Sequence, residues 1–175
     1  MEIALIADDQ KKELMTQFCI AYCGILSKHG ICATLITGKY VEEATGLHIE
    51  RLLSSEHGGL QQIASRISYD EIDMLLYFRE TSPENVNDES DSSLLRLCDL
   101  HNVPVATNIA TAELLVRALD RGDLDWREII NPKSEYNVKK RLYAKELNRR
   151  RHESEAAESA VEPGAAAGPA DEGNE

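Results

Sequence analysis

The chain has 175 residues, of which 42% are hydrophobic, so it is long enough for one domain with a full core and a leftover segment. No run approaches the roughly 18 apolar residues of a membrane helix, and the start does not resemble a signal peptide. The net charge is −12, but residues 152–175 carry −7 of it, which leaves −5 for residues 1–151. We therefore expect a cytoplasmic protein without a nucleic-acid or membrane partner.

Strand and helix signals alternate along residues 1–132. Short apolar runs suit buried strands at Glu2–Ala7, Ile31–Ile36, His48–Leu53, Ile72–Phe78 and Val103–Thr107. Helix patterns lie between and after them, at residues 9–30, 38–45, 58–68 and 92–102 and from Thr111, which is expected as an N-cap. Trp126 is expected as a packing anchor of the closing segment. This order predicts an α/β domain of three layers, with a mostly parallel five-stranded sheet covered by helices on both faces.

The composition changes after Pro132. Val138–Arg151 holds seven Lys or Arg residues and one Glu, which predicts an exposed basic helix. A partner or a membrane surface would suit such a helix, but a solvated helix attracted to the acidic tail explains it as well. Residues 152–175 are of low complexity and lack core-forming side chains. We expect a domain over 1–132, a basic helical extension over 133–151 and a disordered acidic tail over 152–175.

Four cysteines, Cys19, Cys23, Cys32 and Cys98, lie among apolar neighbours. A structural metal would need further Cys or His ligands at matched spacing, and no second pair supplies them. Buried, reduced thiols are the preferred interpretation, with a metal site or a disulfide as the weaker alternative.

Polar residues gather after the expected strands, where α/β domains bind ligands. The first strand is followed by Asp8, Asp9 and Lys12, the second by Thr37 with Thr34 just before, and the third by Ser54, Ser55, Glu56, His57, Gly58 and Gly59. The fourth strand is followed by Arg79, Glu80 and Thr81, and the fifth by Thr107 and Asn108. Hydroxyls, a lysine and paired glycines beside helix N-termini predict a cradle for a small phosphorylated ligand, although neither a P-loop nor a GxGxxG motif is present.

Several segments between Glu2 and Pro132 resemble methylglyoxal synthases: IALIADDQKKELM, ITGKYVEEATGL, GGLQQIASRI, LLRLCDLHNVPVATNIATAELL and RGDLDWREIINP. The resemblance implies a five-stranded parallel sheet and commonly a homohexamer. It also implies a cofactor-free lyase reaction. In it, a carboxylate removes a carbon-bound proton from dihydroxyacetone phosphate, and the enediolate expels phosphate to leave methylglyoxal. Such chemistry needs a base, donors to the enediolate and a grip on the phosphate.

The resemblance also assigns site residues, position by position. In the first loop Asp9 is kept and Lys12 matches the phosphate lysine, whereas Asp8 replaces a histidine that contacts substrate. The Thr-Gly-Thr-Thr phosphate loop is matched by Thr34, Leu35, Ile36 and Thr37, and the next Ser-Gly by Ser54 and Ser55. The catalytic aspartate of Gly-Gly-Asp-Gln-Gln falls on Leu60, and Arg79-Glu80-Thr81 replaces Arg/Trp-Asp-Pro. The second substrate histidine falls on Asn87 and a nearby aspartate on Ser90.

These replacements predict a catalytically impaired family member that binds a small phosphorylated ligand or acts as a regulatory subunit. Leu60 cannot accept a proton, and Asp9 is the catalytic candidate that remains, although an N-cap role explains it equally well. The similar fold of the regulatory domain of carbamoyl phosphate synthetase offers a fold-level analogy for a role without catalysis. One alternative is an active synthase whose base has moved to Asp8, Glu56 or His57. Another is a structural subunit of mixed oligomers with an active paralogue.

Overall fold

The computed structural model describes residues 1–80, 89–130, 138 and 141–151, and the chain divides into two units, Met1–Val138 and Lys139–Glu175. In the second unit, residues 141–151 form a helix whose side chains are exposed except for the half-exposed Glu146. The expected acidic tail and the boundary at residue 132 lie outside the described residues and stay predictions. None of the described helices is both long and apolar enough to cross a membrane. A cytoplasmic location stays a prediction.

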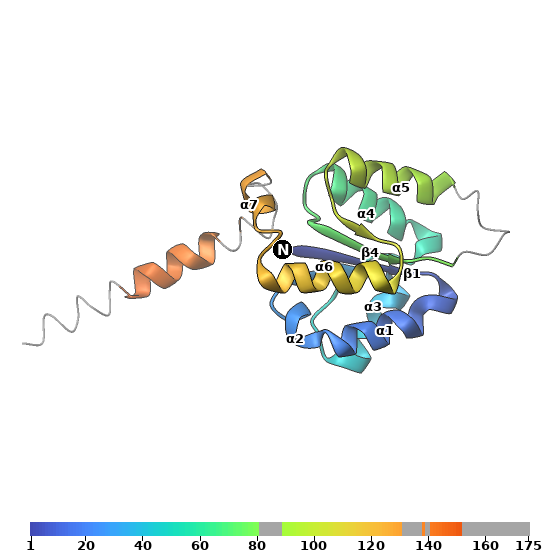
Figure 1. Ribbon diagram of the computed structural model, residues 1–175, viewed down its shortest axis with the longest axis horizontal. Helices are drawn as coiled ribbons and strands as arrows, with labels where there is room; N and C mark the ends of the chain where they lie inside the picture. Colours follow the sequence, from blue (N-terminus) through green and yellow to red (C-terminus); the bar gives the residue numbers. More distant parts are fainter. Residues whose placement is uncertain (81–88, 131–137, 139–140, 152–175) are drawn as a thin grey trace, which may run out of the picture. The chain divides into compact units, whose positions relative to one another are not determined.

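The first unit is built on a sheet of five parallel strands in the order β3-β2-β1-β4-β5. Figure 1 labels its neighbouring strands β1 and β4. The strands are β1 (Glu2–Ala7), β2 (Gly30–Ala33), β3 (Glu50–Arg51), β4 (Met74–Phe78) and β5 (Val105–Ala106). β1 is central, and its Leu5 is in register with Ala33 on one side and Leu76 on the other. The predicted α/β class and parallel sheet are confirmed.

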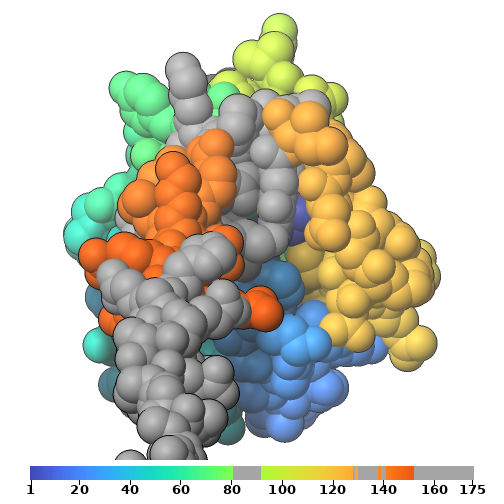
Figure 2. Space-filling model, turned by 90° about the vertical axis from the view of Figure 1, so that its left-hand side faces the viewer, coloured from blue at the N-terminus to red at the C-terminus, as the bar shows by residue number. Residues whose placement is uncertain are grey.

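Helices cover both faces of this sheet (Figure 1). One layer contains α1 (Lys12–Ala21), α2 (Cys23–Leu26), α3 (Leu35–Thr45) and α6 (Ile109–Arg121), and the other contains α4 (Gly59–Ser68) and α5 (Glu89–Leu100). Figure 2 shows α6, in gold, at the surface of this unit, where Leu114 is exposed while Val116 is buried. Successive strands are added outward from β1 in both directions, so right-handed crossovers place the helices on opposite faces.

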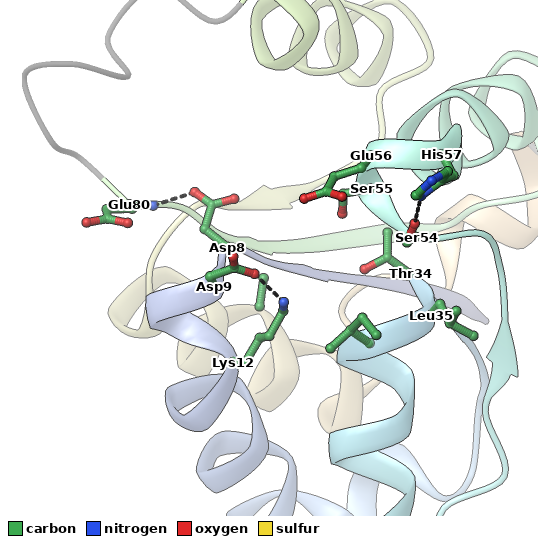
Figure 3. Close-up of a pocket in the computed structure, with 12 residues that line it drawn as sticks. Asp8, Asp9, Lys12, Thr34, Leu35, Ser54, Ser55, Glu56, His57 and Glu80 are labelled. Carbon is green, nitrogen blue, oxygen red and sulfur yellow. Dashed lines mark hydrogen bonds and ion pairs between the residues drawn. The ribbon is translucent and has the colours of Figure 1, made fainter.

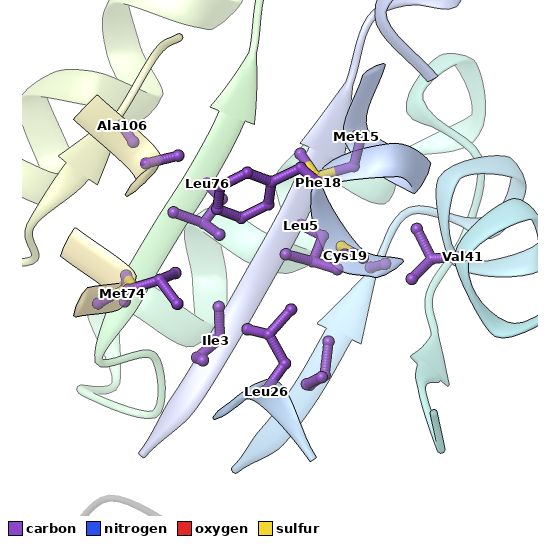
Figure 4. Packing of buried hydrophobic residues seen from close by; sticks show 14 of the residues in the cluster. Ile3, Leu5, Met15, Phe18, Cys19, Leu26, Val41, Met74, Leu76 and Ala106 are labelled. Atoms are coloured by element: carbon purple, nitrogen blue, oxygen red, sulfur yellow. The ribbon is translucent and has the colours of Figure 1, made fainter. Parts of the chain in front are cut away.

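Apolar side chains of β1 are buried on both faces of the sheet, which is why its sequence EIALIA hardly alternates. Ile3 and Leu5 belong to a cluster with the α1 side chains Met15 and Phe18 (Figure 4). Phe18 also meets the ring of Phe78 on β4 edge-on, with centroids 5.6 Å apart. The carboxyl ends of β1 and β4 are therefore anchored by the same core.

The second expected strand is shorter than the apolar run Ile31–Ile36 that predicted it. Its pairing ends at Ala33, whose carbonyl accepts the amide of Leu52, and Thr34 is the extended N-cap residue of α3. The amide of Gly38 then donates to the Thr34 carbonyl at 2.8 Å, so the helix begins at Leu35 and not at Gly38. Two apolar residues read as a strand end are in fact the first helical turn.

Other boundaries were also wrong, mainly where local signals were read without their tertiary partners. The helix expected over residues 9–30 is interrupted at Tyr22, and Gly30 already pairs in β2. The strand expected over His48–Leu53 is reduced to the two residues of β3. Thr111 does not cap α6: its amide donates to the side chain of Asn108, which is the N-cap. α5 begins earlier than expected, and β5 is confined to two residues.

The closing helix α7 (Trp126–Ile130) is anchored by Arg127 and not by Trp126 as expected. Trp126 is 44% exposed, whereas Arg127 is 1% exposed. Its guanidinium donates to the carbonyls of Asn102 and Ile72, and its Nε lies 3.7 Å from Asp73 Oδ1. Asp73 in turn accepts the backbone amide of Glu2 at 2.9 Å. A buried ion pair therefore ties α7 to the amino edge of the sheet.

All four cysteines are free thiols; Cys19, Cys32 and Cys98 are buried, and Cys23 is half-buried. Burial raises the pKa of each of the three buried thiols to about 12, so at pH 8 only about one in ten thousand is a thiolate. We expect iodoacetamide to label Cys23 in the native protein while the other three stay protected, as peptide mass mapping would show. Labelling in denaturant is the control, and rapid native labelling of Cys32 would contradict the buried placement.

Candidate ligand pocket at the carboxyl edge of the sheet

A pocket of about 800 Å³ opens at the carboxyl edge of the sheet (Figure 3). Its walls come from the segments that follow β1, β2, β3 and β4, beside the point where the strand order reverses, which is where such folds bind ligands. The lining residues that the structure describes are Ala7, Asp8, Asp9, Lys12, Thr34, Leu35, Ile36, Ser54, Ser55, Glu56, His57 and Glu80. Six of the predicted site residues are thus brought together: Asp8, Asp9, Lys12, Thr34, Ser54 and Ser55.

Asp8 joins the ends of β1 and β4. Its amide donates to the carbonyl of Phe78 at 3.0 Å, which continues the strand pairing. Its carboxylate accepts the amide of Glu80 at 2.6 Å through Oδ2 and the hydroxyl of Tyr77 at 3.5 Å through Oδ1. This side chain is therefore held in a fixed position at the pocket wall.

Asp9 and Lys12 form an ion pair across the first turn of the helical segment (Figure 3). Asp9 is the first residue of the short 3₁₀ turn η1 (Asp9–Lys11), and the N-cap residues of η1 and α1 are Asp8 and Lys11. The N-cap alternative for Asp9 is therefore wrong. The Lys12 side chain is 20% exposed, while that of Asp9 is 88% exposed. Lys12 therefore reaches the pocket already paired with a carboxylate.

The N-terminus of α3 forms a second wall. Thr34 and Thr37 are buried, and the Thr34 hydroxyl donates to that of Thr37 at 3.1 Å. Thr37 is not among the described lining residues, so it supports Thr34 from behind. Leu35 and Ile36 line the pocket and are 41% and 39% exposed, and the Leu35 amide already donates to the carbonyl of Leu53. Two apolar side chains of the first turn of α3 thus face the pocket.

The loop after β3 supplies the third wall through the turn η2 (Ser55–His57). Ser54 Oγ and His57 Nδ1 share a hydrogen bond of 2.7 Å, and the Ser54 carbonyl accepts the Gly59 amide at 2.9 Å. Gly58 has φ of 99°, a left-handed conformation that glycine adopts without strain. A Cβ on Gly59 would lie 2.2 Å from the Leu53 carbonyl oxygen, so this backbone crossing requires glycine. The glycine pair therefore shapes the loop that carries Ser54.

Leu60, at the position of the implied base, is half-buried and packs against the core cluster under α4. It is not among the described residues that line the pocket, because its apolar side chain joins the other leucines and isoleucines of that face. Asn87 lies outside the described residues, as does the side chain of Ser90. Glu80 follows the fourth strand and lines the pocket, although the sequence does not predict it as a site residue. Nowhere in the described segments do three or more His, Cys, Asp or Glu side chains form a group that could hold a metal ion.

A parallel α/β sheet with a pocket at its carboxyl edge is the architecture in which doubly wound proteins bind small molecules. The chain is 58% identical over 137 residues to methylglyoxal synthase from Caldicellulosiruptor saccharolyticus, covering 78% of this chain and 97% of that protein. It is 49% identical over 135 residues to methylglyoxal synthase from Oceanobacillus iheyensis, covering 77% and 96%.

A crystal structure of methylglyoxal synthase from Elizabethkingia anophelis superposes with a TM-score of 0.60 at 34% identity, covering 66% of this chain and 76% of that one. No protein-family model matches the chain. The relatives and the structure agree with the resemblance read from the sequence. The chain belongs to the methylglyoxal synthase family.

Proposed function

We propose that this chain is a catalytically impaired member of the methylglyoxal synthase family that retains the family's pocket for a small ligand. The observation that carries the proposal is Leu60, which occupies the position of the implied base and packs into the core. A hydrocarbon side chain accepts no proton at any pH, and removing a general base typically costs about 10²- to 10⁴-fold in rate.

Asp8, which lines the pocket, supports the same proposal. The resemblance places a substrate-contacting histidine there, whereas a carboxylate offers only acceptors at neutral pH. Its oxygens accept from the Glu80 amide and the Tyr77 hydroxyl. An ionised carboxylate would repel a developing enediolate where a donor should stabilise it. Of the three requirements of the elimination, this chain therefore lacks two at the expected positions: the base, at Leu60, and the donor to the enediolate, at Asp8.

The proposed ligand binding without turnover rests on the pocket residues that match those of the family. Lys12, Thr34 and Ser54 line the pocket, with Thr37 behind Thr34. The sequence predicts that these residues hold a phosphorylated ligand, together with Asp8, Ser55 and Asn87, and this stays a prediction. A regulatory role, a homohexamer and mixed oligomers with an active paralogue also stay predictions.

The proposal is tested by turnover of dihydroxyacetone phosphate by the full chain, with phosphate and methylglyoxal followed together. We expect no turnover above the uncatalysed rate. Leu60→Asp alone and in combination with Asp8→His and Leu35→Gly should restore activity stepwise, because these changes return the implied base, the donor and the open helix terminus. Leu97→Asp, at another leucine packed on the same cluster, controls for a new carboxylate as such. Robust turnover by the unchanged chain would refute the impairment.

An active synthase with a relocated base is the second candidate, because Glu56 and His57 line the pocket that Leu60 does not. His57 is held by its hydrogen bond with Ser54, so its ring has a defined position. If the unchanged chain is active, Asp8→Asn, Glu56→Gln and His57→Gln distinguish the three candidate bases. Loss of turnover in one variant, with an unchanged unfolding midpoint, would identify the base.

A further inference from the structure

We propose that His57 and Ser54 form a proton-dependent anion site in this pocket, where the imidazolium form of His57 binds the phosphate group of the ligand together with the Ser54 hydroxyl. The inference rests on the proposed retention of the pocket and on the predicted phosphorylated ligand. The resemblance assigns Ser54 to that ligand but gives His57 no such part. Binding of the ligand is then regulated by pH.

Ser54 and His57 lie on one turn of the pocket wall. Both line the pocket, and Ser54 Oγ and His57 Nδ1 share a hydrogen bond of 2.7 Å (Figure 3). The backbone holds this arrangement, because the His57 amide donates to the Ser54 carbonyl at 3.0 Å and the Gly59 amide donates to the same oxygen at 2.9 Å. The imidazole is therefore coupled directly to the hydroxyl that is predicted to bind the phosphate group.

The residue before Ser54 ties this turn to two helices. The Leu53 amide donates to the side-chain oxygen of Gln62 on α4 at 2.8 Å. The Leu53 carbonyl accepts the amide of Leu35, at the start of α3, at 3.2 Å. A ligand therefore meets groups whose positions are already set, which lowers the entropic cost of binding.

The hydrogen bond between the two side chains changes direction with protonation. A serine hydroxyl has one proton to donate, and an unprotonated Nδ1 of His57 uses it, so that Ser54 offers a phosphate group only lone pairs. In the imidazolium form Nδ1 donates to Ser54 Oγ, and the hydroxyl proton is available to a phosphate oxygen. The same protonation makes Nε2 a second donor and adds a positive charge. Protonation of His57 therefore makes the pair a better partner for an anion.

The charges around His57 make this proton important. The other titratable side chains that line the described part of the pocket are Asp8, Asp9, Lys12, Glu56 and Glu80. The lining residues of α3 carry no titratable side chain, and α4 contributes none of the described lining residues. Lys12 is paired with Asp9, so an imidazolium adds a second cation to the described wall. Carboxylates ordinarily stay ionised above about pH 5, whereas imidazole titrates between about pH 5 and 8, so His57 is expected to set the pH dependence in that range.

Sulfate is a suitable probe, because it stays a dianion between about pH 6 and 8, whereas a phosphate monoester itself gains a proton near pH 6. The full chain is titrated with sulfate at constant ionic strength, and binding is followed by the amide NMR signals of the pocket. We expect about tenfold tighter binding at about pH 6 than at about pH 8. By linkage, binding should also take up a proton, which calorimetry in two buffers of different ionisation enthalpy would detect.

The variant His57→Gln keeps a side chain that can hydrogen bond but that cannot gain a charge. It should reduce the affinity ratio between the two pH values to less than about twofold. The matched control His48→Gln changes an exposed histidine that is not among the described lining residues, and it should keep the ratio of about tenfold. A purely structural role of His57 would instead lower the unfolding midpoint of His57→Gln and leave its ratio unchanged.

Equal affinity for sulfate at both pH values would overturn the inference, as would an unchanged ratio in His57→Gln or no sulfate binding at either pH. Titration with dihydroxyacetone phosphate at the higher pH shows whether the pocket is retained at all, so the failure of this inference can be distinguished from the loss of the pocket. The proposed impairment is decided by turnover and not by these affinities.

Discussion

Gly59→Ala is expected to destabilise the folded protein by about 2–4 kcal/mol, because the new methyl group meets backbone and not movable side chains. The Cβ would lie 2.2 Å from the Leu53 carbonyl oxygen and 2.9 Å from that of Ser54. The Gly59 amide also donates to the Ser54 carbonyl, so the loop cannot retreat without losing this bond. Urea unfolding followed by circular dichroism would measure the change.

Gly24→Ala is the matched control. Gly24 lies in α2, and a Cβ there would have no atom within 4 Å. Because alanine favours a helix and restricts the unfolded chain, this change should be neutral or stabilising by up to about 1 kcal/mol. If Gly59→Ala changed the free energy of unfolding no more than Gly24→Ala, the close approach of Gly59 to the Leu53 carbonyl would be wrong. The placement of Ser54, which depends on that approach, would then be wrong as well.

Arg127→Met should cost about 3–5 kcal/mol, because it leaves the buried carboxylate of Asp73 without its cation. Both side chains are 1% exposed, and the Nε of Arg127 stands 3.7 Å from Asp73 Oδ1, close enough for attraction but too far for a hydrogen bond. Desolvation lowers the pKa of Arg127, while Asp73 opposes that change. The same urea experiment would measure the loss.

Arg117→Met provides the exposed comparison on α6, where Arg117 pairs with Glu113 at 2.6 Å. Solvent screens such a surface pair, so its loss should change the stability far less than the loss of Arg127. Asp73→Asn and the double variant Asp73→Asn/Arg127→Met complete the cycle, and the double change should cost less than the sum of the two single ones. Simple additivity would mean that the two buried groups do not stabilise each other.

The central part of the fold follows from local patterns. EIALIA and MLLYF are apolar at nearly every position, as parallel strands covered on both faces require, and both are strands in the structure. In such a sheet the carboxyl ends meet, so Asp8, Lys12, Thr34 and Ser54 could be assigned to one pocket without coordinates. Family motifs added the expectation that Leu60 marks a lost base.

The ends of the strands and helices, and the burial of individual side chains, depend on partners that are distant in the sequence. The run Ile31–Ile36 continues to look like a strand up to Ile36, but β2 ends where its pairing with β3 ends, and the helix takes Leu35 and Ile36. The expected burial of Trp126 is wrong, because hydrophobicity alone predicts it. Arg127 is buried in its place, since Asp73 and the carbonyls of Ile72 and Asn102 supply partners for the guanidinium.

The amino-acid sequence alone determined the family, the parallel α/β fold and the segments that form the pocket, because hydrophobic periodicity and strand-end chemistry are local properties of the chain. Only the tertiary structure decided which of those side chains line the pocket and in what state. Asp9 pairs with Lys12, Asp8 is fixed by β4, and Leu60 turns to the core. Each of these outcomes depends on competition between neighbours in space, which residue order does not record.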